Sequence, residues 1–269
     1  MTRWTRVRGR QSRIVAAAAL SAGSLLAGPA IAHAAPLTVV TIQFDDGNAD
    51  TIHWIDGSLN THGFHATWYV NSGSIETAGH QTWAQLMSVS QAGNEIASHT
   101  VNHVDIKKLK LAAARIQVCQ DRVTLAAHGF QPESFAYPFG DFNSTVETQV
   151  VQYCGDNSAR TVTGVNDRRV FAETIPPLNA FATRTPPDPK QGTTVATIEG
   201  YVTSAEQNGG GWVQLTFHHI CNSCDAYSIT AANMQALLDW LNTQVGTGAV
   251  AVKTTEQVIG GTYVPAFCC

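Results

Sequence analysis

Short apolar and β-branched runs alternate along the chain with longer segments in which apolar residues recur at helical spacing. Seven runs are predicted to be strands: Val39–Phe44, Ala66–Val70, Glu95–Ser98, Ser134–Tyr137, Arg160–Val162, Val213–Phe217 and Ala249–Val252. Six segments between them are predicted to be helices: Asp50–Thr61, Thr82–Gln91, Ile106–Ala127, Thr145–Tyr153, Val195–Gln207 and Thr230–Val245. Alternation over about 230 residues is typical of parallel strands with helices outside them, in a barrel or an open doubly wound sheet.

The end of the first strand distinguishes these two architectures. A doubly wound dinucleotide fold needs a glycine-rich phosphate turn there, whereas this chain continues Phe44-Asp45-Asp46-Gly47. Two carboxylates at that position would repel a pyrophosphate. We therefore predict an α/β fold in the form of a barrel with about seven parallel strands.

The last predicted helix has the clearest boundaries. Thr230 can cap its N-terminus, and its apolar stripe consists of Met234, Leu237, Leu238 and Leu241. Gly129 and Gly246 follow helical patterns and are predicted to end helices. Pro176–Pro189, with five prolines, is predicted to be an irregular crossing.

The N-terminus has the pattern of a secretion signal. Five arginines lie between residues 3 and 13, the apolar run Ile14–Leu26 follows, and Ala32-His33-Ala34 precedes Ala35-Pro36. An apolar run of about 13 residues is shorter than the roughly 20 that span a membrane. We predict a signal peptide at residues 1–34, one catalytic domain at 35–269 and a secreted protein without stable membrane insertion; an uncleaved anchor is the alternative.

Net charge narrows the choice of partners. The whole chain carries −4, but residues 35–269 hold 11 Lys plus Arg against 20 Asp plus Glu. A body this acidic has no electrostatic footprint for nucleic acid or an anionic membrane. We therefore expect no nucleic-acid partner, and we expect a monomer.

Six cysteines, at 119, 154, 221, 224, 268 and 269, lie in the predicted mature part. An even number in an exported chain favours disulfides, and Cys119–Cys154 is our first choice because it would tie two predicted helices together. Cys221-x-x-Cys224 is also half of a zinc-binding pattern, but no second pair stands at zinc-finger spacing. Disulfide is the favoured interpretation and metal the alternative.

Polar residues that are unusual at strand ends follow four of the predicted strands. Asp45-Asp46 closes the first, His99-Thr100-Val101-Asn102-His103 follows the third, Ala136–Gly140 ends the fourth, and His218-His219 follows Val213–Phe217. Function in parallel α/β folds gathers at these ends. One carboxylate with two imidazoles at i and i+4 suits Zn²⁺ or another divalent transition metal.

Four motifs in this order resemble those of the polysaccharide deacetylases of carbohydrate esterase family 4: FDDG (44–47), SHTVNH (98–103), YPFG (137–140) and LTFH (215–218). The resemblance covers residues 37–258. It implies a distorted (β/α) barrel and metal-dependent removal of acetyl groups from N-acetylated amino sugars of a polysaccharide such as chitin or peptidoglycan, with Zn²⁺ as the first choice of metal and Co²⁺ as the alternative.

The resemblance also implies roles for individual residues. Asp46, His99 and His103 would hold the metal, and Asp45 would be the general base. His218 would be the general acid, and the backbone N–H of Phe139 would donate to the oxyanion.

Two departures accompany the resemblance. The family's third motif opens with an arginine that pairs with the base, but this chain has Ala136 there, and the fourth motif's Asp-Trp pair is not visible in 157–171. We hypothesise that Arg184 or Arg160 supplies the missing guanidinium. Strand alternation would send one of His218 and His219 into the barrel mouth, and the family pattern favours His218. Tyr137 and Tyr227 are candidates to stack on a sugar, with packing as the other reading.

Three other functions compete with deacetylation of amino sugars. The same machinery can hydrolyse O-acetyl esters, as in an acetyl-xylan-type esterase. Ala136 favours a catalytically impaired, sugar-binding barrel, whereas Asp45, which a structural metal site would not need, argues against it. A non-haem iron oxygenase also uses two histidines and one carboxylate, but in a different order along the chain.

Overall fold

The computed structural model describes residues 1–2, 38–54, 58–165 and 169–267. Two units, residues 1–33 and 34–269, are distinguished along the chain, and the described strands and helices all lie in the second. The predicted signal peptide and Cys268-Cys269 lie outside the described residues. Among the described residues, no helix is both long and apolar enough to cross a membrane.

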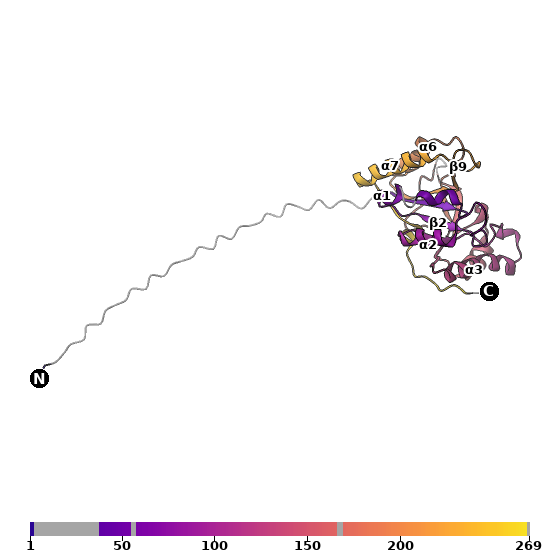
Figure 1. Ribbon diagram of the computed structural model, residues 1–269, viewed down its shortest axis with the longest axis horizontal. Helices are drawn as coiled ribbons and strands as arrows, with labels where there is room; N and C mark the ends of the chain where they lie inside the picture. Colours follow the sequence, from indigo (N-terminus) through magenta and orange to yellow (C-terminus); the bar gives the residue numbers. More distant parts are fainter. Residues whose placement is uncertain (3–37, 55–57, 166–168, 268–269) are drawn as a thin grey trace. The chain divides into compact units, whose positions relative to one another are not determined.

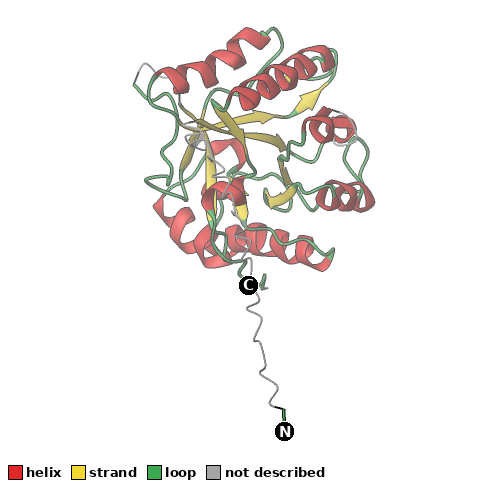
Figure 2. Ribbon diagram, turned by 90° about the vertical axis from the view of Figure 1, so that its left-hand side faces the viewer, coloured by secondary structure: helices red, strands yellow, loops and turns green. Residues whose placement is uncertain are grey.

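The second unit alternates strands and helices, with the strands in the middle and helices around them (Figures 1 and 2). Its strands are β1 (Thr38–Asp45), β2 (Thr67–Val70), β3 (Glu95–Ser98), β4 (Ser134–Ala136), β5 (Ser158–Gly164), β6 (Thr183–Thr185), β7 (Gly211–Phe217), β8 (His219–Ile220), β9 (Ser228–Ile229) and β10 (Val250–Val252). Its α-helices are α1 (Asn60–His62), α2 (Trp83–Gln91), α3 (Leu111–Ala127), α4 (Ser144–Val146), α5 (Gln152–Cys154), α6 (Val195–Gln207), α7 (Ala231–Thr247) and α8 (Thr255–Ile259). The 3₁₀ and π segments are η1 (Ala49–Trp54), η3 (Ile106–Lys108), η4 (Pro138–Gly140) and η5 (Glu147–Val151).

The parallel sheet is a nearly closed barrel centred on β1. Strand β7 pairs with β1 from Thr38 to Phe44, while the other edge of β1 is shared by β10 and β2. From β2 the order continues β3-β4-β5-β6. Between β6 and β7 the described residues show no ladder, and the Gln214 side chain donates to the Arg184 carbonyl across that gap at 3.0 Å. The predicted distorted (β/α) barrel is confirmed.

Several details differ from the predicted elements. Strands β6, β8 and β9 are absent from the prediction because each has only two or three residues, too few to show an alternating pattern. The predicted helix 145–153 is broken into α4, η5 and α5. Helix α7 ends at Thr247 with Gly248 in the left-handed conformation, so the predicted stop at Gly246 is wrong by two residues. The Thr230 cap is confirmed by its bond from the Asn233 N–H.

Side chains alternate between two environments along the strands. Val40, Ile42 and Phe44 of β1 point outward into an apolar cluster that also contains buried side chains of α6 and α7. The alternate positions Gln43 and Asp45 are buried inside the barrel. The apolar face therefore anchors the helices, and polar residues are left to fill the interior.

Hydrogen bonds join the polar side chains inside the barrel on the amino-terminal side of Asp45. Gln43 donates to Gln214 at 3.0 Å and to Thr255 at 3.2 Å, and Tyr69 donates to Thr255 at 3.0 Å. Thr255 is the first residue of α8, so the N-terminus of this helix contacts the interior of the barrel. The backbone N–H of Glu256 donates to the buried carboxylate of Glu95 at 2.9 Å.

The disulfide Cys119–Cys154 joins α3 to α5, as predicted. Both cysteines are 1% exposed. A second disulfide, Cys221–Cys224, closes the start of the loop between β8 and β9. The disulfide interpretation of this Cys-x-x-Cys pair therefore holds in the structure.

We expect Glu95 to make stability fall as pH rises. Burial and the nearby Glu256 carboxylate raise the pKa of Glu95 to about 7 from an ordinary 4.5. The folded state therefore keeps a proton on Glu95 that the unfolded state loses. This contribution to the free energy of unfolding is complete below pH 4.5 and is lost as the pH rises to about 7. At about 1.4 kcal/mol per pKa unit, the loss is on the order of 3 kcal/mol.

Urea unfolding of wild type and Glu95→Gln across that pH range measures this effect. The stability of wild type relative to Glu95→Gln should fall with rising pH, since glutamine cannot titrate. Glu76→Gln, which changes an exposed side chain, is the control. A wild-type and Glu95→Gln pair with parallel pH curves would contradict the expectation.

Candidate active site

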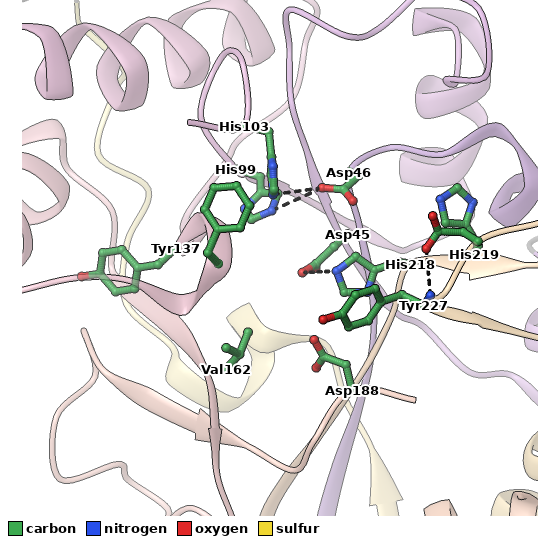
Figure 3. A pocket seen from close by; sticks show the side chains of 12 residues that line it. Asp45, Asp46, His99, His103, Tyr137, Val162, Asp188, His218, His219 and Tyr227 are labelled. Atoms are coloured by element: carbon green, nitrogen blue, oxygen red, sulfur yellow. Dashed lines mark hydrogen bonds and ion pairs between the residues drawn. The ribbon is translucent and has the colours of Figure 1, made fainter. Parts of the chain in front are cut away.

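The carboxyl ends of the parallel strands bring the predicted site residues to one cavity of about 360 Å³ (Figure 3). Asp45 is the last residue of β1 and Asp46 follows it; His99 follows β3 and His218 follows β7. His103 and Phe139 complete the part of the lining that the sequence predicts. The structure thus gathers side chains that lie up to 173 positions apart in the sequence.

Asp46, His99 and His103 face one another at a spacing suited to a metal ion. The Nε2 atoms of His99 and His103 lie 3.5 and 3.4 Å from the same Asp46 oxygen, Oδ1. Ligands at about 2.0–2.2 Å from a tetrahedral zinc are separated by similar distances. Asp46 Oδ1 is buried and has no hydrogen-bond partner, so a cation would satisfy it. This carboxylate–imidazole set fits a divalent transition metal.

His99, one of the three side chains of this set, is held in place by hydrogen bonds from behind. His99 Nδ1 lies 2.8 Å from the Ala136 carbonyl, which fixes the tautomer that leaves Nε2 facing Asp46. The buried carboxylate of Asp121 accepts hydrogen bonds from the His99 backbone at 3.1 Å and from Ser98 Oγ at 2.6 Å. Burial would raise the pKa of Asp46, but the nearby imidazoles of His99 and His103 outweigh it and hold that pKa well below its usual value.

Backbone strain gathers at the same place. Asp46, Thr100, His103 and Phe139 all have positive φ, between 50° and 70°. Each such residue costs about 1–3 kcal/mol and persists where the surroundings over-determine it. The turn at Gly140 is equally tight, since a Cβ there would lie 2.4 Å from Val162.

A buried ion pair holds the predicted base. Arg160 Nη2 donates to both oxygens of Asp45, at 2.7 and 2.5 Å, and the two residues are 1% and 3% exposed. The guanidinium also lies 4.9 Å from the centre of the Tyr69 ring. Arg160 and Ala136 are direct cross-strand partners, so the guanidinium enters from β5 at the level where the family pattern places it on β4.

Arg184, the other candidate, does not pair with Asp45. It follows Thr183, the cross-strand partner of Arg160, so alternation along β6 sends its side chain to the opposite face. There it makes a bidentate pair with Glu173, at 2.9 and 2.7 Å. The assignment of Arg184 to the site is therefore corrected: Arg160 is the arginine beside Asp45.

His218 faces the other side of Asp45. Its Nε2 lies 3.9 Å from Asp45 Oδ2, and its Nδ1 is buried without a hydrogen-bond partner. His219 also lines the cavity, and its Nδ1 lies 2.8 Å from Asp50 Oδ2. Alternation does not separate the two histidines, because β7 ends at Phe217 and the chain turns into β8.

Asp188 is a cavity residue that the sequence did not single out. Its Oδ1 is buried without a hydrogen-bond partner, and it lies close to His218 in Figure 3. Burial raises the pKa of Asp188, against the opposing charges of Arg160 and His218. Its position in the proline-rich segment Pro176–Pro189 gave no strand or motif to place it. It is a carboxylate in the same cavity as His218, the residue that the family's fourth motif would support.

The aromatic candidates separate by exposure. Tyr137 is 1% exposed and donates to the Phe181 carbonyl at 3.0 Å, so it packs rather than presenting a free face. Tyr227 is 39% exposed, with its ring centre 5.2 Å from that of His218. Phe139 is 63% exposed and contacts His103 edge-on. Phe139 and Tyr227 are the two exposed rings at this cavity.

Residues 33–156 match the family model of the polysaccharide deacetylases. Comparison with curated proteins finds no match. The resemblance that the four motifs indicate is thereby confirmed.

Solved structures share the fold at low sequence identity. A polysaccharide deacetylase from Bacillus cereus matches with a TM-score of 0.50 and 18% identity. The match covers 60% of this chain and 50% of that one. The peptidoglycan deacetylase PdaC from Bacillus subtilis matches with a TM-score of 0.51 and 17% identity, over 82% of this chain and 90% of that one. A family 4 acetyl xylan esterase from Clostridium thermocellum, in complex with a cobalt ion, matches with a TM-score of 0.56 and 16% identity over the same shares.

We expect the non-reduced protein to bind one equivalent of Zn²⁺ through Asp46, His99 and His103. Asp46→Ala should weaken binding by more than the roughly 10- to 100-fold that loss of an indirect hydrogen-bond partner costs, because it removes a ligand. Equilibrium dialysis measures this. Asp225→Ala, which removes another carboxylate from the cavity lining, is the matched control and should retain the ion. Equal loss in both variants would show that the cavity's general negative charge, not the triad, holds the metal.

Proposed function

We propose, on the premise that this chain is a relative of the polysaccharide deacetylases, that it hydrolyses the acetamido group of N-acetylated amino sugars in a polysaccharide. The observation that carries the proposal is the position of Asp45. It lies between His218 on one side and the Asp46–His99–His103 set on the other, and Arg160 pairs with it from within the barrel. A hydrolytic base, an acid and a metal-ligand set thus share one cavity.

Asp46, His99 and His103 would hold a divalent ion, with Zn²⁺ the proposed metal and Co²⁺ an alternative. Such an ion, when bound, lowers the pKa of water and polarises a carbonyl oxygen. The cobalt complex of the Clostridium thermocellum esterase supports Co²⁺ as the alternative.

The chain's own residues supply the proton transfers. Asp45 accepts the proton of the attacking water, and Arg160 holds the carboxylate in place by its two hydrogen bonds. The Phe139 N–H lies in the first turn of η4, where backbone donors lack intrahelical partners, and donates to the oxyanion that forms. His218 donates a proton to the departing nitrogen.

Asp188 is the proposed support for His218. Both residues line the cavity, Asp188 Oδ1 and His218 Nδ1 are buried without a hydrogen-bond partner, and a carboxylate that faces an imidazole orients it. Asp188 thereby takes the place of the acidic residue that the fourth family motif would supply. The alternative function, a catalytically impaired sugar-binding barrel, rested on Ala136. That argument is weakened, because Arg160 provides the guanidinium from the neighbouring strand.

We further propose that the protein acts outside the cytoplasm on an acetylated polysaccharide or oligosaccharide. The N-terminal pattern of residues 1–34 and the acidic composition of the remainder support this. Phe139 and Tyr227, both exposed in the cavity lining, offer apolar faces to a sugar ring.

We expect chelator-sensitive acetate release from N-acetylglucosamine oligomers, restored by Zn²⁺ or Co²⁺. Asp45→Asn should lower kcat by at least 100-fold, because loss of a general base typically costs 10²–10⁴-fold. The assay measures acetate from protein that is metal-free, metal-restored or carries Asp45→Asn. Release from acetylated xylan but not from the amino-sugar oligomers would move the assignment to an O-acetyl esterase. If neither substrate releases acetate although the metal is bound, the protein would be a sugar-binding protein and not a hydrolase.

Arg160→Ala should lower kcat/KM by more than tenfold, about 1.4 kcal/mol of barrier, and destabilise the fold by about 3–5 kcal/mol by leaving Asp45 unpaired. Arg160→Lys should fall between the two proteins, since an ammonium cannot reproduce the bidentate contact. Arg184→Ala is the matched control: it breaks the Glu173 pair but does not touch Asp45. Its kcat/KM, measured on folded protein, should stay within threefold of wild type. A larger loss in Arg184→Ala than in Arg160→Ala would refute the assignment of Arg160.

A further inference from the structure

The loop between β8 and β9 carries a second group of metal-ligating side chains, separate from the Asp46 set. Cys221 and Cys224 form a disulfide there, and the Cys224 N–H donates to Cys221 Sγ at 3.0 Å. Ligand atoms of these cysteines and of Asp50 all lie within 4.8 Å of one another. Asp50 is the second residue of η1 and reaches the loop from a distant part of the sequence.

The Asp50 carboxylate is aimed at the two sulfurs. Its Oδ2 lies 3.7 Å from Cys224 Sγ and 2.8 Å from His219 Nδ1. Its other oxygen, Oδ1, is buried without a hydrogen-bond partner. An imidazole bonded to a carboxylate is the arrangement that orients metal ligands in proteins. The sequence offered only half of a zinc pattern, and the fold adds Asp50 as a third potential ligand.

We propose that the reduced Cys221–Cys224 pair, together with Asp50, forms a binding site for Zn²⁺ or another thiophilic divalent ion, with His219 orienting Asp50. A dithiol reductant transfers two electrons and two protons to the disulfide and becomes a cyclic disulfide, which leaves two cysteine thiols. Binding of the ion then releases the two thiol protons to solvent, because the ligands are thiolates. Two sulfurs and one oxygen leave a fourth tetrahedral position for water.

The two disulfides of the described residues differ in their accessibility to a reductant. Cys224 is exposed and Cys221 is partly exposed, whereas Cys119 and Cys154 are both 1% exposed. Attack by a thiolate needs access to a sulfur. The Cys221–Cys224 bond is therefore reduced first, while the disulfide that fastens α3 to α5 stays closed.

Co²⁺ distinguishes this site from the Asp46 set, because only thiolate ligands give a sulfur-to-cobalt charge-transfer band in the near ultraviolet. The experiment uses the protein with Cys268→Ser and Cys269→Ser, since those cysteines lie outside the described residues. Non-reduced protein should bind one equivalent of Co²⁺ without the band. After mild dithiol treatment and removal of the reductant without oxygen, a second equivalent should bind with the band.

Three variants make the result specific. Cys221→Ser with Cys224→Ser should abolish the second equivalent, and Asp50→Asn should weaken it more than tenfold, whereas Ser223→Ala is the matched loop control and should keep it. Asp46→Ala should remove the first equivalent and leave the second, so failure of the proposed deacetylase site would be seen separately. The proposal is overturned if reduced protein gains no second equivalent, or if the band persists without Cys221 and Cys224.

Discussion

The ion pair between Asp45 and Arg160 is the contact on which the rest of the site depends. A carboxylate that is 3% exposed must be paired, because an isolated buried charge costs several kcal/mol. The guanidinium that pairs with it needs room inside the barrel, and Ala97 and Ala136 provide that room as small buried residues beside Tyr69. Ala136 in the third motif and Arg160 therefore belong together. The guanidinium comes from β5 instead of β4, and the small side chain of Ala136 leaves space for it.

Alternation with a period of two explains why this barrel can hold a charged site above a stable base. The inward positions of β1 pass from the amide of Gln43, held by Gln214 and Thr255, to the carboxylate of Asp45. The layer around Gln43 is closed by the first turn of α8, where Thr255 accepts from Gln43 and Tyr69. The upper layer opens to the cavity, where charge can meet a ligand. The inward side chains in the middle of the sheet therefore stabilise the barrel, and the inward side chain at the end of β1, Asp45, faces the cavity.

The sequence predicted the barrel, seven of its strands and the residues of the cavity that sit in motifs, because long apolar patterns and strand ends are local signals. It left Arg160 and Arg184 undecided, since the choice depends on register: Arg160 lies opposite Ala136, while Arg184 is one position beyond the partner of Arg160 and so points away. Asp188 escaped notice for a related reason. It lies in a proline-rich segment without periodicity, and only the path of the chain through space brings it to His218. Asp50 likewise meets Cys224 by tertiary folding alone.

Strain at the proposed metal-ligand set favours a functional role for the cavity. Asp46, Thr100 and His103 adopt left-handed backbone, and the packing that enforces it comes from buried contacts such as those of Asp121 with His99. Each strained residue costs about 1–3 kcal/mol, which the fold would recover by relaxing if these loops only joined strands. The strain instead holds Asp46 Oδ1 unpartnered between two imidazoles, while Asp45 is fixed beside it by Arg160. Charges that are oriented before substrate arrives need no reorganisation during reaction, and that is the property by which such a site accelerates hydrolysis.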